Sequence, residues 1–159
     1  MTEDQKNLLD AKKVYEALCA MLDGRNWYYQ KQEERLSITC GAQGEDLPMY
    51  ISMEVDAKRQ LVLLRSEMPF AVAENRRAAL AVAVSKANCE IVDGSFDYDY
   101  LSGKIIFRMT SGYRGCIVDK EMLDYLLGCS CATIDYFNDK FLDVSKNDMS
   151  FDQILEYIQ

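Results

Sequence analysis

Apolar residues recur at three- and four-residue spacing along two stretches of the chain, which is the period of an amphipathic helix. In residues 3–23 the stripe consists of Leu8, Ala11, Tyr15, Leu18 and Leu22. In residues 119–142 it consists of Met122, Leu126, Cys129, Thr133, Tyr136 and Phe137. Both stretches are therefore predicted to be helices that bury one side.

Two further segments are predicted to be helical. Residues 74–88 are rich in alanine, which allows a helix to lie close against its neighbour. A short segment near the C-terminal end carries Phe151, Ile154, Leu155 and Ile158. The pairs Thr2 with Gln5 and Ser150 with Gln153 have the spacing of a capping box, which predicts where the first and the last helix begin.

Period-two patterns of apolar residues predict five strands. They are residues 35–40, 49–55, 61–64, 96–100 and 105–109. A break at residues 41–48 separates the first two. The third strand, Leu61-Val62-Leu63-Leu64, is apolar on both sides and is expected to be buried on both faces. Residues 101–104 are the predicted turn of a hairpin between the last two strands, and residues 27–29 either add a short strand or extend the first.

The order of elements is α-βββ-α-ββ-α with one further helix at the end. Strands grouped in this way predict a mostly antiparallel five-stranded sheet with helices packed on it, which is a two-layer α+β fold. We expect a single domain over residues 1–159, with a core of about residues 5–142 and a helical tail over residues 143–159. The length agrees with this expectation, since typical domains have about 100–150 residues.

The amino-acid composition excludes or disfavours several classes of function. With 18 Lys and Arg against 26 Asp and Glu, the net charge is −8, which disfavours nucleic acid and anionic membrane surfaces. The sequence has no histidine, so Ser-His-Asp and Cys-His nucleophile pairs, histidine-ligated metals and histidine proton shuttles are excluded. No acidic pair or glycine-rich loop has the spacing of a catalytic or phosphate-binding site. We therefore expect a protein that is not an enzyme and uses no cofactor.

The cysteines and the N-terminal segment indicate a cellular location. The six cysteines show no Cys-x-x-Cys spacing, and most lie in apolar patterns, where a free thiol packs as a small apolar group. Cys116, after Arg114 and Gly115, is the best candidate for a reactive thiol, but we expect it to be inert. The N-terminal segment is polar, and the longest apolar run, residues 78–84, is far shorter than the roughly 20 residues that span a bilayer. We expect a soluble, cytoplasmic protein with reduced cysteines.

Several short motifs in the middle of the chain occur together. They are Met68-Pro69, Arg76-Arg77, Asn88, Gly94-Ser95-Phe96-Asp97 and Gly103-Lys104-Ile105-Ile106-Phe107-Arg108. In this combination the chain resembles the YbjN-like family, which is similar in fold to the type III secretion chaperones. The resemblance covers about residues 5–142, and its most specific part is the Asn-x5-Gly-x-Phe block from Asn88 to Phe96.

The resemblance implies the α-βββ-α-ββ-α order of the secretion chaperones. It also implies turn conformations at Gly94 and Gly103, and core positions for Phe96 and Phe107. In function it implies a small, acidic, often dimeric bacterial protein of the cytoplasm that binds other proteins and acts in sensing or regulation. It supplies no catalytic residues.

The best metal candidate is the acidic group Asp93, Asp97 and Asp99, because hard cations require several carboxylate oxygens at one point. Asp97 and Asp99 are expected to share one face of a strand, about 7 Å apart. The spacing of an EF-hand loop is absent. The alternative explanation, which we favour, is that these residues form the solvent face of a hairpin whose aromatic face is buried.

A possible interaction surface follows from the strand pattern. Tyr50, Val62, Leu64, Ile106 and Arg108 are predicted to lie opposite the core face of the sheet. If helices cover one side only, these residues form a patch of apolar, aromatic and arginine side chains, a mixture typical of interfaces. The alternative is that the alanine-rich helix or the tail covers them.

Two functional hypotheses follow. The first is a non-enzymatic protein-binding module, chaperone-like or regulatory, that acts through a sheet face or a dimer interface and forms a homodimer. The alternative is a small-ligand or metal-binding sensor that uses the acidic hairpin around residues 93–99.

Overall fold

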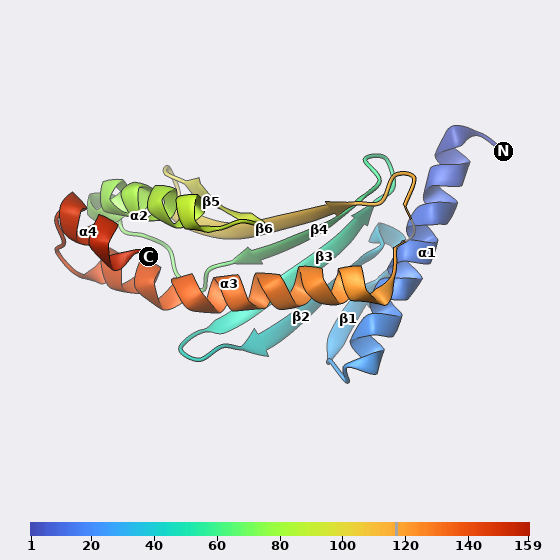
Figure 1. Ribbon diagram of the computed structural model, residues 1–159, viewed down its shortest axis with the longest axis horizontal. Helices are drawn as coiled ribbons and strands as arrows, with labels where there is room; N and C mark the ends of the chain where they lie inside the picture. Colours follow the sequence, from blue (N-terminus) through green and yellow to red (C-terminus); the bar gives the residue numbers. More distant parts are fainter. Residues whose placement is uncertain (117) are drawn as a thin grey trace.

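The computed structural model describes residues 1–116 and 118–159 (Figure 1). Its helices are α1 (Glu3–Gly24), α2 (Arg77–Glu90), α3 (Lys120–Lys146) and α4 (Phe151–Tyr157). Its strands are β1 (Tyr29–Gln32), β2 (Ser37–Gln43), β3 (Pro48–Asp56), β4 (Leu61–Glu67), β5 (Ser95–Asp99) and β6 (Lys104–Gly112). Two short 3-10 helices, Glu33–Arg35 and Glu74–Arg76, precede β2 and α2. The predicted α+β class is confirmed, and the order of elements agrees with the predicted one except for an additional strand before β2.

All six strands form one antiparallel sheet in the order β1-β2-β3-β4-β6-β5. The prediction of five strands was one too few. The additional strand, β1, starts at Tyr29, so of the two alternatives for residues 27–29 a separate short strand is the correct one, although it lies at residues 29–32. It has only four residues and three of them are exposed, so it carries no apolar alternation. The predicted break after Cys40 was also placed too early, because Gly41–Gln43 continue β2 and pair with Pro48–Tyr50 of β3.

The helices lie on one side of this sheet. Figure 1 shows α3 along the length of the molecule, α1 at one end, and α2 with α4 at the other. The core between the layers includes Met53, Leu64 and Phe107 from the sheet and Leu18 and Phe141 from the helices, each fully buried. In the part of the chain that the structure describes, no helix covers the opposite sheet face.

The Asn-x5-Gly-x-Phe block holds the edge strand β5. The Asn88 side-chain amide donates to the Phe96 carbonyl (3.0 Å), and the Phe96 N–H donates to the Asn88 side-chain oxygen (2.8 Å). Asn88 thereby forms hydrogen bonds with both backbone polar groups of Phe96, a residue on the edge strand of the sheet. Gly94 has a φ of 80°, and a Cβ there would lie 2.5 Å from the Phe107 ring. The most specific part of the sequence resemblance is thus structural.

The turn between β5 and β6 also requires glycine. Gly103 has a φ of 74°, and a Cβ there would lie 2.3 Å from the Val72 carbonyl oxygen. The Val72 N–H donates to the Gly103 carbonyl (2.9 Å), so this turn is fastened to the segment before α2. The expected turn conformations of Gly94 and Gly103 are both confirmed.

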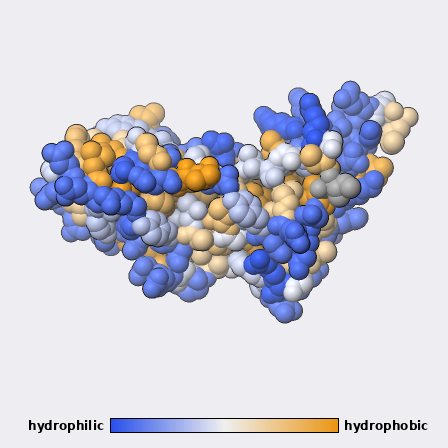
Figure 2. Space-filling model, in the orientation of Figure 1, coloured by the Kyte–Doolittle hydropathy of each residue, from blue (hydrophilic) through white to orange (hydrophobic). Residues whose placement is uncertain are grey.

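The C-terminal tail packs on the helix side of the molecule, against α2. Ile154 and Ile158 are fully buried, whereas Phe151 and Leu155 are 55% and 42% exposed. Figure 2 shows hydrophobic residues gathered over this end of the molecule. Both predicted capping boxes are present, Thr2 with Gln5 and Ser150 with Gln153. The predicted tail boundary at residue 142 falls inside α3, and the tail leaves the open sheet face uncovered.

The predicted stripe on α3 was rotated from the true one. The buried residues are Leu123, Leu126, Leu127, Ser130, Ile134, Phe137, Asn138, Phe141 and Val144. Cys129 and Thr133 are only partly buried, and Tyr136 is 53% exposed. The error arose because α3 is apolar on two sides, so spacing alone did not identify the side that faces the sheet.

Candidate functional site: the open face of the sheet

The uncovered face of the sheet is built from alternate residues of its strands. Strand register places Ser52 of β3 opposite Arg65 of β4, and Arg65 opposite Arg108 of β6. Two positions further along, Glu67 of β4 lies opposite Ile106 of β6. Tyr50, on the same face of β3, is 63% exposed. Three of the predicted contact residues, Tyr50, Ile106 and Arg108, therefore share this open face.

Val62 and Leu64 were predicted on this face, and that placement was wrong. Both are fully buried, because Leu64 pairs with Met53 and Met109 on the core face of the sheet. The segment from Leu61 to Leu64 is apolar at every position, so its pattern does not reveal which alternate pair faces the core.

The open face of β4 is instead formed by Leu61, Leu63, Arg65 and Glu67. None of these four residues was predicted to lie on the open face. The alternation of Arg65, Ser66 and Glu67 just after the apolar run was the signal that could have identified this face, since the two charged positions are two apart.

A shallow hollow of about 520 Å³ lies on this face. Its lining includes Tyr28, Tyr50, Arg65, Glu67 and Ile106. Tyr28 is 90% exposed, so its ring and that of Tyr50 are both available for contact. Exposed tyrosine and arginine beside aliphatic side chains are typical of protein interfaces.

Two ion pairs lie on this face. Asp97 of β5 accepts two hydrogen bonds from the Arg108 guanidinium, at 2.7 and 3.0 Å. These bonds raise the pKa of Arg108 above its ordinary value. Lys104 lies 3.0 Å from Glu67. Arg65, by contrast, has no ion-pair partner within residues 1–116 and 118–159.

The three candidate metal ligands do not converge. Asp97 and Asp99 share the exposed face of β5 as expected, but Asp97 is held by Arg108. Asp93 accepts a hydrogen bond from the Tyr125 hydroxyl, so it points toward α3 in the helix layer. Among the described residues, no three His, Cys, Asp or Glu side chains are grouped to hold a metal ion. The predicted acidic cluster is thus divided between separate partners.

Asp99 organises the β5–β6 turn. Its carboxylate accepts hydrogen bonds from the Ser102 hydroxyl (2.6 Å) and the Leu101 N–H (3.1 Å). These bonds favour the ionised form and hold the pKa of Asp99 below its ordinary value. Because the pKa is lower in the folded state, the stabilising effect is present above the ordinary pKa and is lost as pH falls through the folded-state pKa.

We expect Ser102→Ala to raise the pKa of Asp99 toward its ordinary value of about 3.9. The measurement is an NMR titration of the Asp99 carboxyl carbon in the wild type and in the variant. Ser111→Ala, on the neighbouring strand β6, is the control and should leave the titration unchanged. An Asp99 pKa equal in the wild type and in Ser102→Ala would contradict the role given to this hydroxyl.

The cysteines offer no activated thiol at this site. All six are free. Burial raises the pKa of Cys40 and of Cys131 to about 11, so both thiols stay protonated near neutral pH. Cys116, the predicted candidate for a reactive thiol, is exposed.

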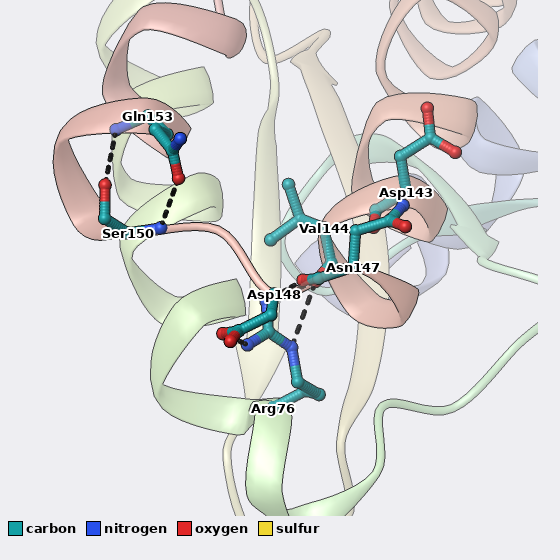
Figure 3. A network of polar contacts seen from close by, with 7 residues as sticks. All are labelled: Arg76, Asp143, Val144, Asn147, Asp148, Ser150 and Gln153. Atoms are coloured by element: carbon teal, nitrogen blue, oxygen red, sulfur yellow. Dashed lines mark hydrogen bonds and ion pairs between the residues drawn. The ribbon is translucent and has the colours of Figure 1, made fainter.

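A second group of polar contacts lies away from the open face, where α3 ends (Figure 3). The Arg76 guanidinium donates to the Val144 carbonyl at 2.8 and 3.3 Å and also to the Asn147 carbonyl. Its Nη1 atom lies 3.6 Å from the Asp148 carboxylate. Carbonyl groups at the end of a helix lack intrahelical partners, and a cation there is favourable. Arg76 thus joins the start of α2 to the segment that leads into α4.

Comparison with known proteins identifies relatives in fold. No family model matches the chain, and no curated protein matches its sequence. Among solved structures, YbjN from E. coli, a candidate transcription regulator, is similar with a TM-score of 0.57 at 11% identity, over 77% of this chain and 86% of YbjN. A chain of the ExsC–ExsE complex is similar with a TM-score of 0.54 at 13% identity, over 81% of this chain and 93% of that one. The fold expected from the resemblance is confirmed by these neighbours.

No helix of the described residues is both long and apolar enough to cross a membrane.

Proposed function

We propose that this protein is a non-enzymatic protein-binding module, chaperone-like or regulatory, that holds its partner on the open face of the sheet. The observation that carries the proposal is this face itself. Its hollow presents Tyr28, Tyr50, Ile106 and Arg65 to solvent, while the chain's own helices and tail all pack on the other side. Such a mixture of aromatic, aliphatic and arginine side chains favours contact with another protein.

The fold neighbours support the same proposal. One of them was solved as a complex of two proteins, ExsC and ExsE, and the other, YbjN, is a candidate regulator. Two carboxylates of the open face, Asp97 and Glu67, are held in ion pairs, an arrangement that suits binding better than acid–base catalysis. Six free cysteines suit a bacterial cytoplasm, where we place the protein.

We further propose a homodimer that pairs through the outer side of α3. Tyr125 and Tyr136 are 55% and 53% exposed there, and Cys129, Ala132 and Thr133 lie between them. These five residues line one side of a hollow of about 510 Å³, and residues 91–93 line the other. Apolar and aromatic side chains that are exposed together on one side of a helix favour cover by another protein surface. A second copy would provide it and leave the open sheet face free for the partner.

Site-specific photo-crosslinking tests both proposals in the cells that produce the protein. A benzophenone amino acid at position 50, in place of Tyr50, should join the chain to a different protein. The same amino acid at position 132, in place of Ala132, should give an adduct of two chains of 18.2 kDa each. Position 4, in place of the exposed Asp4 in the first turn of α1, is the control and should give neither adduct.

Adducts that are identical at positions 4 and 50 would contradict a partner site on the sheet. An adduct of two chains at position 50 and none at position 132 would instead place the dimer interface on the sheet face.

A further inference from the structure

The central cation of the open face lacks the counter-charge that its neighbours have. Arg65 and Arg108 lie directly opposite one another on β4 and β6, and like charges in this arrangement are destabilising. Asp97 neutralises Arg108 through two hydrogen bonds. No carboxylate of the described residues does the same for Arg65, which is exposed in the hollow. One uncompensated guanidinium therefore remains at the centre of the face.

The nearest carboxylate on the same strand already forms an ion pair. Glu67 is two residues from Arg65, but it is paired with Lys104 at 3.0 Å. The Arg65 guanidinium thus keeps its fork of N–H donors available for a carboxylate from outside the chain, with which such a fork forms two parallel hydrogen bonds.

One row further along the strands, Tyr50 and Ile106 lie on either side of Glu67. Ile106 and Glu67 are paired across β6 and β4, two residues beyond the pair formed by Arg65 and Arg108. Tyr50 is likewise two residues beyond Ser52, the partner of Arg65 on β3. Two residues of a strand span about 7 Å, so the cation and the Tyr50–Ile106 row are separated by the distance between alternate side chains of an extended peptide.

Resting on the proposed function, we infer that the partner enters this hollow as an extended segment with an acidic residue and an apolar or aromatic residue two positions apart. The acidic side chain pairs with Arg65. The apolar side chain packs against Tyr50 and Ile106, over Glu67, whose charge is paired with Lys104. Tyr28 lines the same hollow.

The net charge of −8 does not oppose this pairing. Charges on the surface more than a Debye length away, about 8 Å at physiological ionic strength, are largely screened. The local charge of Arg65 therefore decides which side chain is accepted at this point of the face.

The test uses a displayed library of random peptides, selected on the full-length wild-type chain and on Arg65→Glu. Peptides from the wild type should be enriched in the pattern of Asp or Glu, any residue, then an apolar or aromatic residue. Arg65→Glu should select Lys or Arg at the first position. For a synthetic peptide of the wild-type set, changing its acidic residue to the amide should weaken binding about tenfold, measured by fluorescence anisotropy.

Two control variants separate the possible failures. Arg35→Glu reverses a charge that lies outside the hollow and should leave the selected pattern unchanged. Ile106→Asp should abolish binding of the wild-type peptides while the circular dichroism spectrum stays native. If peptides depend on Ile106 but show no acidic preference, the inference is overturned and the proposed function stands. If the selected peptides bind Ile106→Asp as well as the wild type, the proposed binding face itself is wrong.

Discussion

Replacing Phe141 with alanine is expected to lower the free energy of unfolding by about 3–5 kcal/mol, because it removes a fully buried ring and leaves a cavity. The Phe141 ring packs edge-on against Phe96 at 4.9 Å between centroids and lies parallel to Phe137 at 5.9 Å. Phe96 in turn contacts Phe107 at 5.1 Å. This cluster joins the second half of α3 to the β5–β6 hairpin, so its loss weakens the contact between the two layers.

Urea unfolding followed by circular dichroism gives the measurement. Phe151→Ala is the matched control, since Phe151 is 55% exposed and its loss should cost less than about 1 kcal/mol. We also expect a single unfolding transition, in agreement with our proposal that the 159 residues form one domain. Equal losses in Phe141→Ala and Phe151→Ala would contradict the packing of the aromatic cluster.

Replacing Arg76 with methionine is expected to destabilise the protein by about 2–3 kcal/mol and to loosen α4, because hydrogen bonds from a charged donor to two carbonyls are lost. The Arg76 side chain is only 17% exposed, so water does not readily replace it at the Val144 and Asn147 carbonyls. Hydrogen exchange of the segment from residue 148 to 159 should accelerate more than that of α1.

Asp148→Asn distinguishes the carbonyl contacts from the ion pair. The Asp148 carboxylate is fully exposed and 3.6 Å from the Arg76 guanidinium, so the pair is screened by solvent. We expect unfolding and exchange of this variant to match those of the wild type. An effect as large as that of Arg76→Met would mean that the ion pair, and not the capping of α3, holds the tail.

The candidate site was only partly predictable from the sequence. The alternation of Met49, Tyr50 and Ile51 was enough to place Tyr50 on the open face, because only one side of β3 is apolar. The same reasoning failed for Val62 and Leu64, since β4 is apolar on both sides and only its register with β3 and β6 decides which face is buried. The sequence could not predict that Arg65 lacks an ion-pair partner among the described residues. This depends on Asp97 being paired with Arg108 and Glu67 with Lys104.

The sequence by itself determined most of the elements and their order: the capping boxes at Thr2 and Ser150, the β5–β6 hairpin, the turn glycines and an α+β class with grouped antiparallel strands. These features are local, since each depends on the spacing or the backbone freedom of residues close together in the chain. Only the tertiary structure decided which side of α3 faces the sheet, that the tail packs on α2, and that Asp93 points away from Asp97. Those outcomes depend on contacts between segments far apart in the chain. In a helix or strand that is apolar on two sides, the pattern does not show which side faces the core.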